Sequence, residues 1–218
     1  MDSVKSILCF GDSNTFGSDP AKNHERHPYE ARWTTRLQKL LGEGYHVIAE
    51  GMGGRTTVFD DPLLEGRNGL AILPVLLHSH RPLDLVILSL GTNDCKLNLN
   101  NTPGIIARGM ERLILAVRGC DNGPGNPPPK VLLVSPIHMG PGIKNSRFGV
   151  FDDHSRQIVQ GIAEQYQELA AQYGCAFFDA AKAAGPGPDQ LHMDAASHAS
   201  LAQALAPMVR DLLQEERP

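Results

Sequence analysis

A serine near the start of the chain lies in surroundings that favour nucleophilic chemistry. Ser13 stands in a Phe-Gly-Asp-Ser-Asn stretch, residues 10–14, which directly follows an apolar run. If that run is a strand, the turn after it exposes the serine hydroxyl at the carboxyl edge of a sheet, where α/β proteins bind ligands. A serine hydroxyl is a poor nucleophile unless a base removes its proton, so the hypothesis requires a histidine and a group that orients it.

Both partners stand near the other end of the chain. Asp189 precedes His192 by three residues, and in a tight turn its carboxylate can hold one imidazole nitrogen while the other faces Ser13. The order serine, aspartate, histidine, without a Gly-x-Ser-x-Gly sequence, argues against the nucleophile elbow of ordinary α/β-hydrolases. The residues therefore predict a serine hydrolase with Ser13 as nucleophile, His192 as base and Asp189 as its orienting group.

Histidine pairs elsewhere invite a metal interpretation, because imidazole is a common zinc ligand. The pairs are His24 with His27, and His78 with His80, and neither has a cysteine or aspartate at ligand spacing. His78 and His80 fall at the end of a helix, where a solvated histidine interacts favourably with the helix dipole. Residues 51–54 are rich in glycine but lack the Gly-x-Gly-x-x-Gly spacing of a dinucleotide loop. We expect neither a metal nor another cofactor.

Five short apolar segments predict the strands that would position these residues. They are nearly continuous in hydrophobicity rather than alternating, as in a parallel sheet covered on both faces. The segments are residues 5–10, 45–50, 83–90, 130–135 and 175–179.

Helical patterns lie between the predicted strands. In the first of them, Leu37, Leu40 and Leu41 share helical spacing with Trp33, and Gly174 is expected to end the longest. Because a parallel sheet needs a crossover helix between successive strands, the alternation predicts a three-layer α/β fold, in a single domain over residues 1–218. The four clearest patterns are residues 30–41, 103–119, 153–173 and 197–213.

Composition and charge disfavour several classes of partner. Hydrophobic residues make up 41% of the 218 residues, and the formal net charge of -4 gives no basic field for nucleic acid or an anionic membrane. No run reaches the roughly 18 apolar residues of a membrane span, and the first residues hold no apolar leader, so we expect a cytoplasmic protein. The four cysteines are far apart, which favours buried free thiols over disulfides or a zinc site.

Four blocks in order make the chain resemble the SGNH hydrolases, also called GDSL esterases. The resemblance implies a flavodoxin-like sandwich with a five-stranded parallel sheet. It also implies that Ser13, Asp189 and His192 are catalytic, and that Ser13, Gly54 and Asn93 form the oxyanion hole. The blocks are Gly11-Asp12-Ser13, Gly51-Met52-Gly53-Gly54, Gly91-Thr92-Asn93-Asp94 and Asp189-Gln190-Leu191-His192.

The residues around these blocks are expected to shape the pocket and hold the loops. Asp12 and Asp94 are predicted to bind backbone amides, as in Asx turns. Asn14 and Phe16 replace the Leu and Trp that relatives often carry, and together with Asp12 they are the predicted substrate-binding residues. The loop 139–150 follows a strand end and is interpreted as a wall or lid of the site, or as a plain connection.

A finer resemblance points to the cytoplasmic arylesterase and acyltransferase branch of the family. It implies an enzyme that hydrolyses short-chain acyl esters, acetyl or aryl, through an acyl-enzyme released by water or an alcohol. Acyltransferase or perhydrolase activity and a homo-oligomer, an octamer in some members, are implied as well. The resemblance rests on Tyr29-Glu30-x-Arg32-Trp33-Thr34, Glu50-Gly51, Arg55-Thr56-Thr57, Asp60-Asp61-Pro62 and residues 82–87.

Other functions are compatible with the same residues. Within the enzymes, a carbohydrate O-deacetylase or a lysophospholipase or thioesterase of the same fold stays open. Outside them, a protein with these blocks could bind an ester or glycan without turnover.

Overall fold

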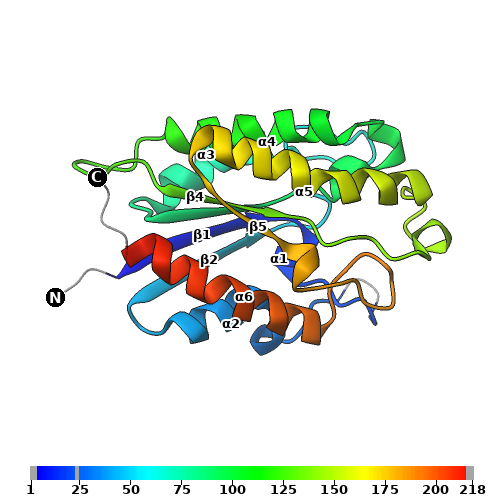
Figure 1. Cartoon of the computed structure of the whole chain (residues 1–218), viewed down its shortest axis with the longest axis horizontal. Helices are drawn as coiled ribbons and strands as arrows, with labels where there is room; N and C mark the ends of the chain where they lie inside the picture. Colours follow the sequence, from blue (N-terminus) through cyan, green and yellow to red (C-terminus); the bar gives the residue numbers. More distant parts are fainter. Residues whose placement is uncertain (1–3, 23–24, 215–218) are drawn as a thin grey trace.

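A five-stranded, all-parallel sheet forms the centre of the computed structural model, which describes residues 4–22 and 25–214 (Figure 1). The strand order is β2-β1-β3-β4-β5, the order of flavodoxin-like folds. The predicted α/β class and the five predicted strands are therefore confirmed. The strands are β1 (Lys5–Gly11), β2 (Tyr45–Gly51), β3 (Leu85–Ser89), β4 (Lys130–Ser135) and β5 (Ala176–Asp179).

Helices cover both faces of the sheet (Figure 1). Leu8 and Phe10 of β1 pack into the core beneath α3, α4 and α5, whereas Ile7 and Cys9 of the same strand pack toward α2 and α6. Both faces of β1 are thus buried, which is why its sequence is continuously apolar. The helices are α1 (Ser13–Phe16), α2 (Trp33–Leu41), α3 (Gly69–His80), α4 (Pro103–Arg118), α5 (Asp153–Tyr173) and α6 (Ala195–Gln214).

Short 3₁₀ turns fill several connections between these elements. They are η1 (Tyr29–Ala31), η2 (Asn93–Cys95), η3 (Leu97–Leu99), η4 (Ile143–Asn145) and η5 (Ala180–Lys182).

Two helices differ from their sequence prediction. The pattern over residues 30–41 divides into η1 and α2, and Leu40 is 39% exposed rather than buried. The sequence indicates only the end of α3, because this helix is apolar on nearly all sides and so lacks the 3.6-residue periodicity that marks a helix. The longest helix, α5, matches its prediction, with Gly174 at φ +56° ending it.

All four cysteines are free thiols, and Cys9 and Cys95 are fully buried while Cys120 and Cys175 are half-buried. Among the helices that the structure describes, none combines the length and apolar composition needed to cross a bilayer. One member of the predicted histidine pairs, His24, lies outside the described residues.

Candidate active site

The serine and asparagine blocks lie at the carboxyl edge of neighbouring strands. β1 leads through Asp12 into α1, whose first residue is Ser13, and β3 leads into η2, whose first residue is Asn93. Since β1 and β3 pair in parallel, both loops emerge side by side at the point where the strand order reverses. This switch point is the usual ligand site of open α/β sheets.

Ser13, His192 and Asp189 form a hydrogen-bonded chain. The Nε2 atom of His192 lies 2.9 Å from Ser13 Oγ, and its Nδ1 atom lies 2.6 Å from Asp189 Oδ2. Ser13 and His192 are each 7% exposed, so little water competes for these bonds. With the Nδ1 proton donated to the carboxylate, Nε2 is free to accept the proton of the serine hydroxyl.

The Asp-x-x-His turn fixes its own carboxylate. Oδ1 of Asp189 accepts the backbone N–H groups of Leu191 and His192, at 3.0 and 2.8 Å. Burial raises the pKa of this carboxyl, but the hydrogen bonds from His192 outweigh burial, so the pKa lies below its ordinary value. Asp189 is therefore ionised at neutral pH. Within the same turn, Gln190 adopts φ +69°, a left-handed conformation that is uncommon outside glycine.

The residue after the base is held from two sides. Met193 donates its backbone N–H to Asn14 Oδ1 at 2.9 Å, and its carbonyl accepts from His27 Nε2 at 2.9 Å. Asn14 and His27 are both buried. This role of His27 could not be predicted from the sequence, because 166 residues separate it from Met193. Together the two side chains anchor the backbone that carries His192.

The loops that carry Gly54 and Asn93 are joined by Arg55. Asn93 Nδ2 donates to the Arg55 carbonyl at 3.1 Å, and the Arg55 guanidinium donates to the Gly11 carbonyl at 2.8 Å while lying over the Phe10 ring. Burial lowers the pKa of Arg55 to about 10, which leaves it charged at neutral pH. Arg55 thus connects the end of β1 with the loops after β2 and β3.

The backbone N–H groups of Gly54 and Ser13 are available to a ligand. Among the described residues, neither donates a hydrogen bond to another group. Gly54 has φ +79°, a conformation that favours glycine. Asn93 uses its amide for the bond to Arg55, and an amide carries a second N–H. These three residues can supply donors to a developing negative charge.

Two buried aspartates hold the loops, as the sequence led us to expect. Asp12 Oδ1 accepts the Asn14 N–H at 2.9 Å, and Asp94 Oδ1 accepts the Thr57 N–H at 2.9 Å. Burial raises the pKa of both carboxyls, that of Asp94 to about 6. Their role is structural support beside the nucleophile and the asparagine.

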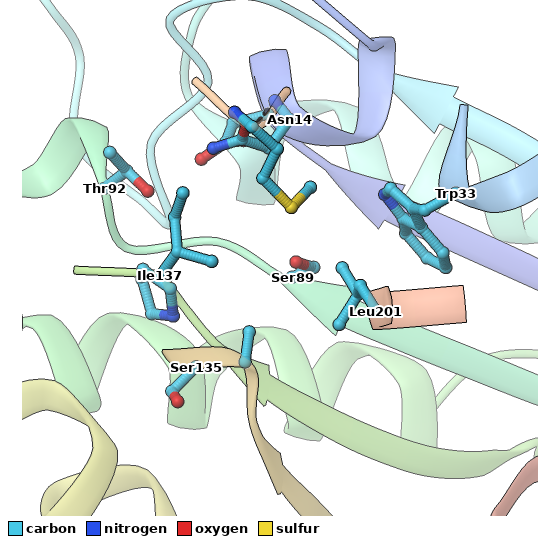
Figure 2. A pocket seen from close by; sticks show the side chains of 11 residues that line it. Asn14, Trp33, Ser89, Thr92, Ser135, Ile137 and Leu201 are labelled. Atoms are coloured by element: carbon cyan, nitrogen blue, oxygen red, sulfur yellow. Dashed lines mark hydrogen bonds between the residues drawn. The ribbon is translucent and has the colours of Figure 1, made fainter. Parts of the chain in front are cut away.

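Asp12 and Asn14 were predicted to bind substrate, but both line a small internal cavity. Asn14, Ser89, Thr92 and Ser135 are among the residues that line this space, and Figure 2 labels them. The cavity measures about 20 Å³, room for roughly one water molecule and too little for an acyl group. The structure therefore places both side chains behind the site, where their oxygens already accept backbone hydrogen bonds.

A larger cleft of about 650 Å³ opens beside the base. It is lined by Phe16, Met52, Phe148 and His192. Phe16, a predicted substrate-binding residue, therefore borders a space large enough for a substrate. The Phe148 and His192 rings meet edge to face, with centroids 5.5 Å apart. The loop 139–150 is thus a wall of the cleft. The sequence pointed to this loop because it follows a strand end, but nothing in the sequence singled out Phe148.

The wall is fastened to the turn that carries the triad. Gly140 donates its N–H to the Gln190 carbonyl at 2.9 Å, and Gly142 donates to Gln190 Oε1 at 3.1 Å. A movement of residues 139–150 would therefore disturb the segment between Asp189 and His192.

A hydrogen-bonded serine, histidine and aspartate beside free N–H donors is the arrangement of a serine hydrolase. The chain belongs to the GDSL-like lipase/acylhydrolase family, whose model matches residues 9–200. The SGNH family and fold expected from the four sequence blocks are confirmed. The protein is accordingly a carboxylic ester hydrolase.

Solved structures and one curated protein are similar to the chain. An M. smegmatis aryl esterase is 41% identical, with a TM-score of 0.91, over 96% of this chain and 100% of that one. A carbohydrate acetylesterase from Sinorhizobium meliloti is 40% identical, with a TM-score of 0.88, over 95% of this chain and 99% of that one. An acetylxylan esterase from Xylanibacter ruminicola is 29% identical over 79% of this chain, which spans only 35% of that protein.

Proposed function

We propose that the protein hydrolyses short-chain acyl esters, acetyl esters foremost, through an acyl-enzyme on Ser13. The observation that carries the proposal is the 2.9 Å contact between Ser13 Oγ and His192 Nε2, with Asp189 2.6 Å behind the imidazole. The names of the similar proteins, an aryl esterase and two acetyl esterases, support a small acyl group.

In the first half-reaction, Ser13 Oγ attacks the ester carbonyl carbon while its proton passes to His192 Nε2. The carbonyl oxygen becomes an oxyanion, which the N–H groups of Ser13 and Gly54 and the amide of Asn93 stabilise. The bond between the carbonyl carbon and the alcohol oxygen then breaks. His192 returns its proton to the leaving alcohol, and the acyl group stays on Ser13.

In the second half-reaction, water attacks the acyl-enzyme while His192 takes one of its protons. The bond to Ser13 Oγ breaks, the hydroxyl regains its proton from His192, and the acid leaves. Asp189 accepts the Nδ1 hydrogen bond throughout and stabilises the imidazolium. An alcohol or peroxide that replaces water gives acyl transfer or perhydrolysis by the same steps.

A second candidate is a carbohydrate O-deacetylase, which the two acetyl esterases among the similar proteins favour. Turnover of acetylated xylo-oligosaccharide at a higher kcat/KM than an aryl acetate would favour this candidate. Faster turnover of octanoyl than of acetyl esters would instead favour a lysophospholipase or thioesterase.

Substitution of the nucleophile tests the proposal. Ser13→Ala should reduce kcat for p-nitrophenyl acetate by at least about 10⁴-fold, because the remaining donors cannot form an acyl-enzyme. Ser200→Ala, an exposed position on α6, serves as the matched control and should keep full activity. Activity that survives in Ser13→Ala, or none in the wild type, would reject the proposal, and the latter would favour a non-catalytic binding protein.

Assembly and location stay predictions. A homo-oligomer, an octamer in the branch that the sequence resembles, is checked by light scattering. A cytoplasmic location is checked by cell fractionation.

A further inference from the structure

Two arginines in the cleft beside His192 have no acidic partner. Arg67 and Arg147 both line this space of about 650 Å³. No carboxylate among the described residues forms an ion pair with either guanidinium. Free positive charge at this place contrasts with the formal net charge of -4 of the whole chain.

The acidic residues of the same cleft are already engaged. Glu25 pairs with Lys22 at 3.5 Å. Asp19 accepts the Ala21 N–H at 2.9 Å and faces the His27 ring, with Nδ1 3.8 Å from Oδ2. With Glu25 balanced by Lys22, the two arginines outnumber the remaining carboxylate, that of Asp19, and the formal charge of the cleft lining is +1.

Arg67 lies against the proposed oxyanion glycine. A methyl group added at Gly54 would come within 3.2 Å of Arg67 Nε. The guanidinium donates through Nη1 to the Glu65 carbonyl at 2.6 Å, while its Nε is buried without a hydrogen-bond partner among the described residues.

Arg147 lies beside Phe148, which in turn contacts the base. Its guanidinium carbon is 5.3 Å from the centre of the Phe148 ring, which itself meets the His192 ring. The two arginines thus border the reacting centre at its oxyanion side and at its base side. A planar guanidinium binds a carboxylate through two parallel hydrogen bonds, so both are suited to an anionic ligand.

We propose that Arg67 and Arg147 make the enzyme selective for acyl esters whose alcohol part carries an anionic group. The proposal rests on the proposed function of the same site. Because the acyl group is short in that function, the alcohol part fills the remainder of the cleft, where the arginines lie. A charge-assisted hydrogen bond to such a group corresponds to about a tenfold gain in kcat/KM, reduced where the cleft is open to water.

Matched aryl acetates test the proposal. The anionic probe is 4-acetoxybenzoate, and its neutral counterpart is 4-acetoxybenzamide, which has the same shape. The wild type should prefer the benzoate by about tenfold in kcat/KM. Arg67→Gln and Arg147→Gln should each lower this ratio by threefold or more, and the double variant should bring it near one. Added salt should lower the wild-type ratio as well, because ions screen charges at partly exposed sites.

Arg112→Gln is the matched control for the loss of one positive charge. Arg112 is exposed on α4 and does not line the cleft, so this variant should keep the wild-type ratio. Equal changes of the ratio in Arg112→Gln and the cleft variants would contradict the proposal, since they would reflect overall charge.

Two failures are distinguishable. If the wild type hydrolyses both acetates with no preference for the benzoate, the charge selectivity is overturned and the esterase function stands. If it hydrolyses neither, the proposed function fails, and calorimetry on Ser13→Ala then tests the arginines alone. Tighter binding of 4-acetoxybenzoate than of 4-acetoxybenzamide, lost in the Arg67 and Arg147 variants, would support an anion site. Equal binding would overturn it.

Discussion

Asp189 acts through both of its oxygens. Oδ2 accepts the Nδ1 proton of His192, and Oδ1 accepts backbone N–H groups of the turn. The first bond sets the tautomer and the second fixes the angle of the carboxylate to the ring. Because these bonds lower the pKa of Asp189 despite burial, the negative charge is present when His192 takes the serine proton.

Removal of that charge should leave the fold and impair the chemistry. Asp189→Asn should lower kcat for p-nitrophenyl acetate about 10³- to 10⁴-fold, because an amide favours the wrong imidazole tautomer. Asp194→Asn is the control in the same segment, since Asp194 accepts the Ser197 N–H and asparagine is also a good helix cap. A loss below tenfold in Asp189→Asn, with an unchanged melting temperature, would show that the carboxylate is dispensable.

The site is assembled from loops that follow β1, β2 and β3 and from the turn before α6. Asn14 on α1 and His27 in the next loop reach across to Met193 and hold that turn at the edge of the sheet. Gly51 allows this edge to close, because a Cβ there would lie 2.0 Å from the Phe16 backbone nitrogen. The alignment of His192 with Ser13 thus depends on contacts between elements that are far apart in the sequence.

The Asn14 contact predicts a loss of alignment when it is removed. Asn14→Ala should reduce kcat about 10- to 100-fold, since small displacements of a catalytic group are costly and the Met193 N–H would lose its acceptor. Steady-state kinetics on p-nitrophenyl acetate, together with a thermal melt, measure the effect. His27→Gln retains a donor near the Met193 carbonyl and should lose less activity than His27→Ala. Full activity in Asn14→Ala would contradict the anchoring role.

Two buried carboxylates under the catalytic edge make the stability of the whole molecule depend on pH. Burial raises the pKa of Asp94 to about 6, above its value in an unfolded chain. The native state then binds a proton more tightly than the unfolded state. The stabilisation from Asp94 is therefore complete below about pH 4 and is lost as the pH rises through about 6.

A comparison of the wild type with Asp94→Asn isolates this contribution. The free energy of unfolding of the wild type, relative to the variant, should fall by about 2 kcal/mol between pH 4 and pH 7.5. Urea denaturation at several pH values measures it. Asp121→Asn should show no such fall, because a backbone hydrogen bond from Gly123 lowers the pKa of Asp121. A relative stability of Asp94→Asn that stays constant with pH would exclude the shift.

The strands, most helices and the residues of the triad could be predicted from the sequence alone. Runs such as residues 5–10 are apolar throughout because both faces of a parallel sheet are buried, and Asp189 and His192 are close enough in the chain to meet in one turn. Four ordered blocks then indicated the family. These signals are local in the chain, or are carried by residue types that the chemistry itself requires.

The contacts that hold and border the site became visible in the three-dimensional fold. No sequence pattern indicates that Asn14 and His27 bind the backbone of Met193, which lies far from both in the chain. The same holds for the connection of three loops by Arg55 and for the contact of Phe148 with His192. Arg67 and Arg147, 80 residues apart, border one cleft because the loops after β2 and β4 face each other across the carboxyl edge of the sheet. Packing brings such residues together, and neither their spacing in the chain nor the composition indicates these contacts. Ser13 could therefore be identified from the sequence, whereas the residues around it could not.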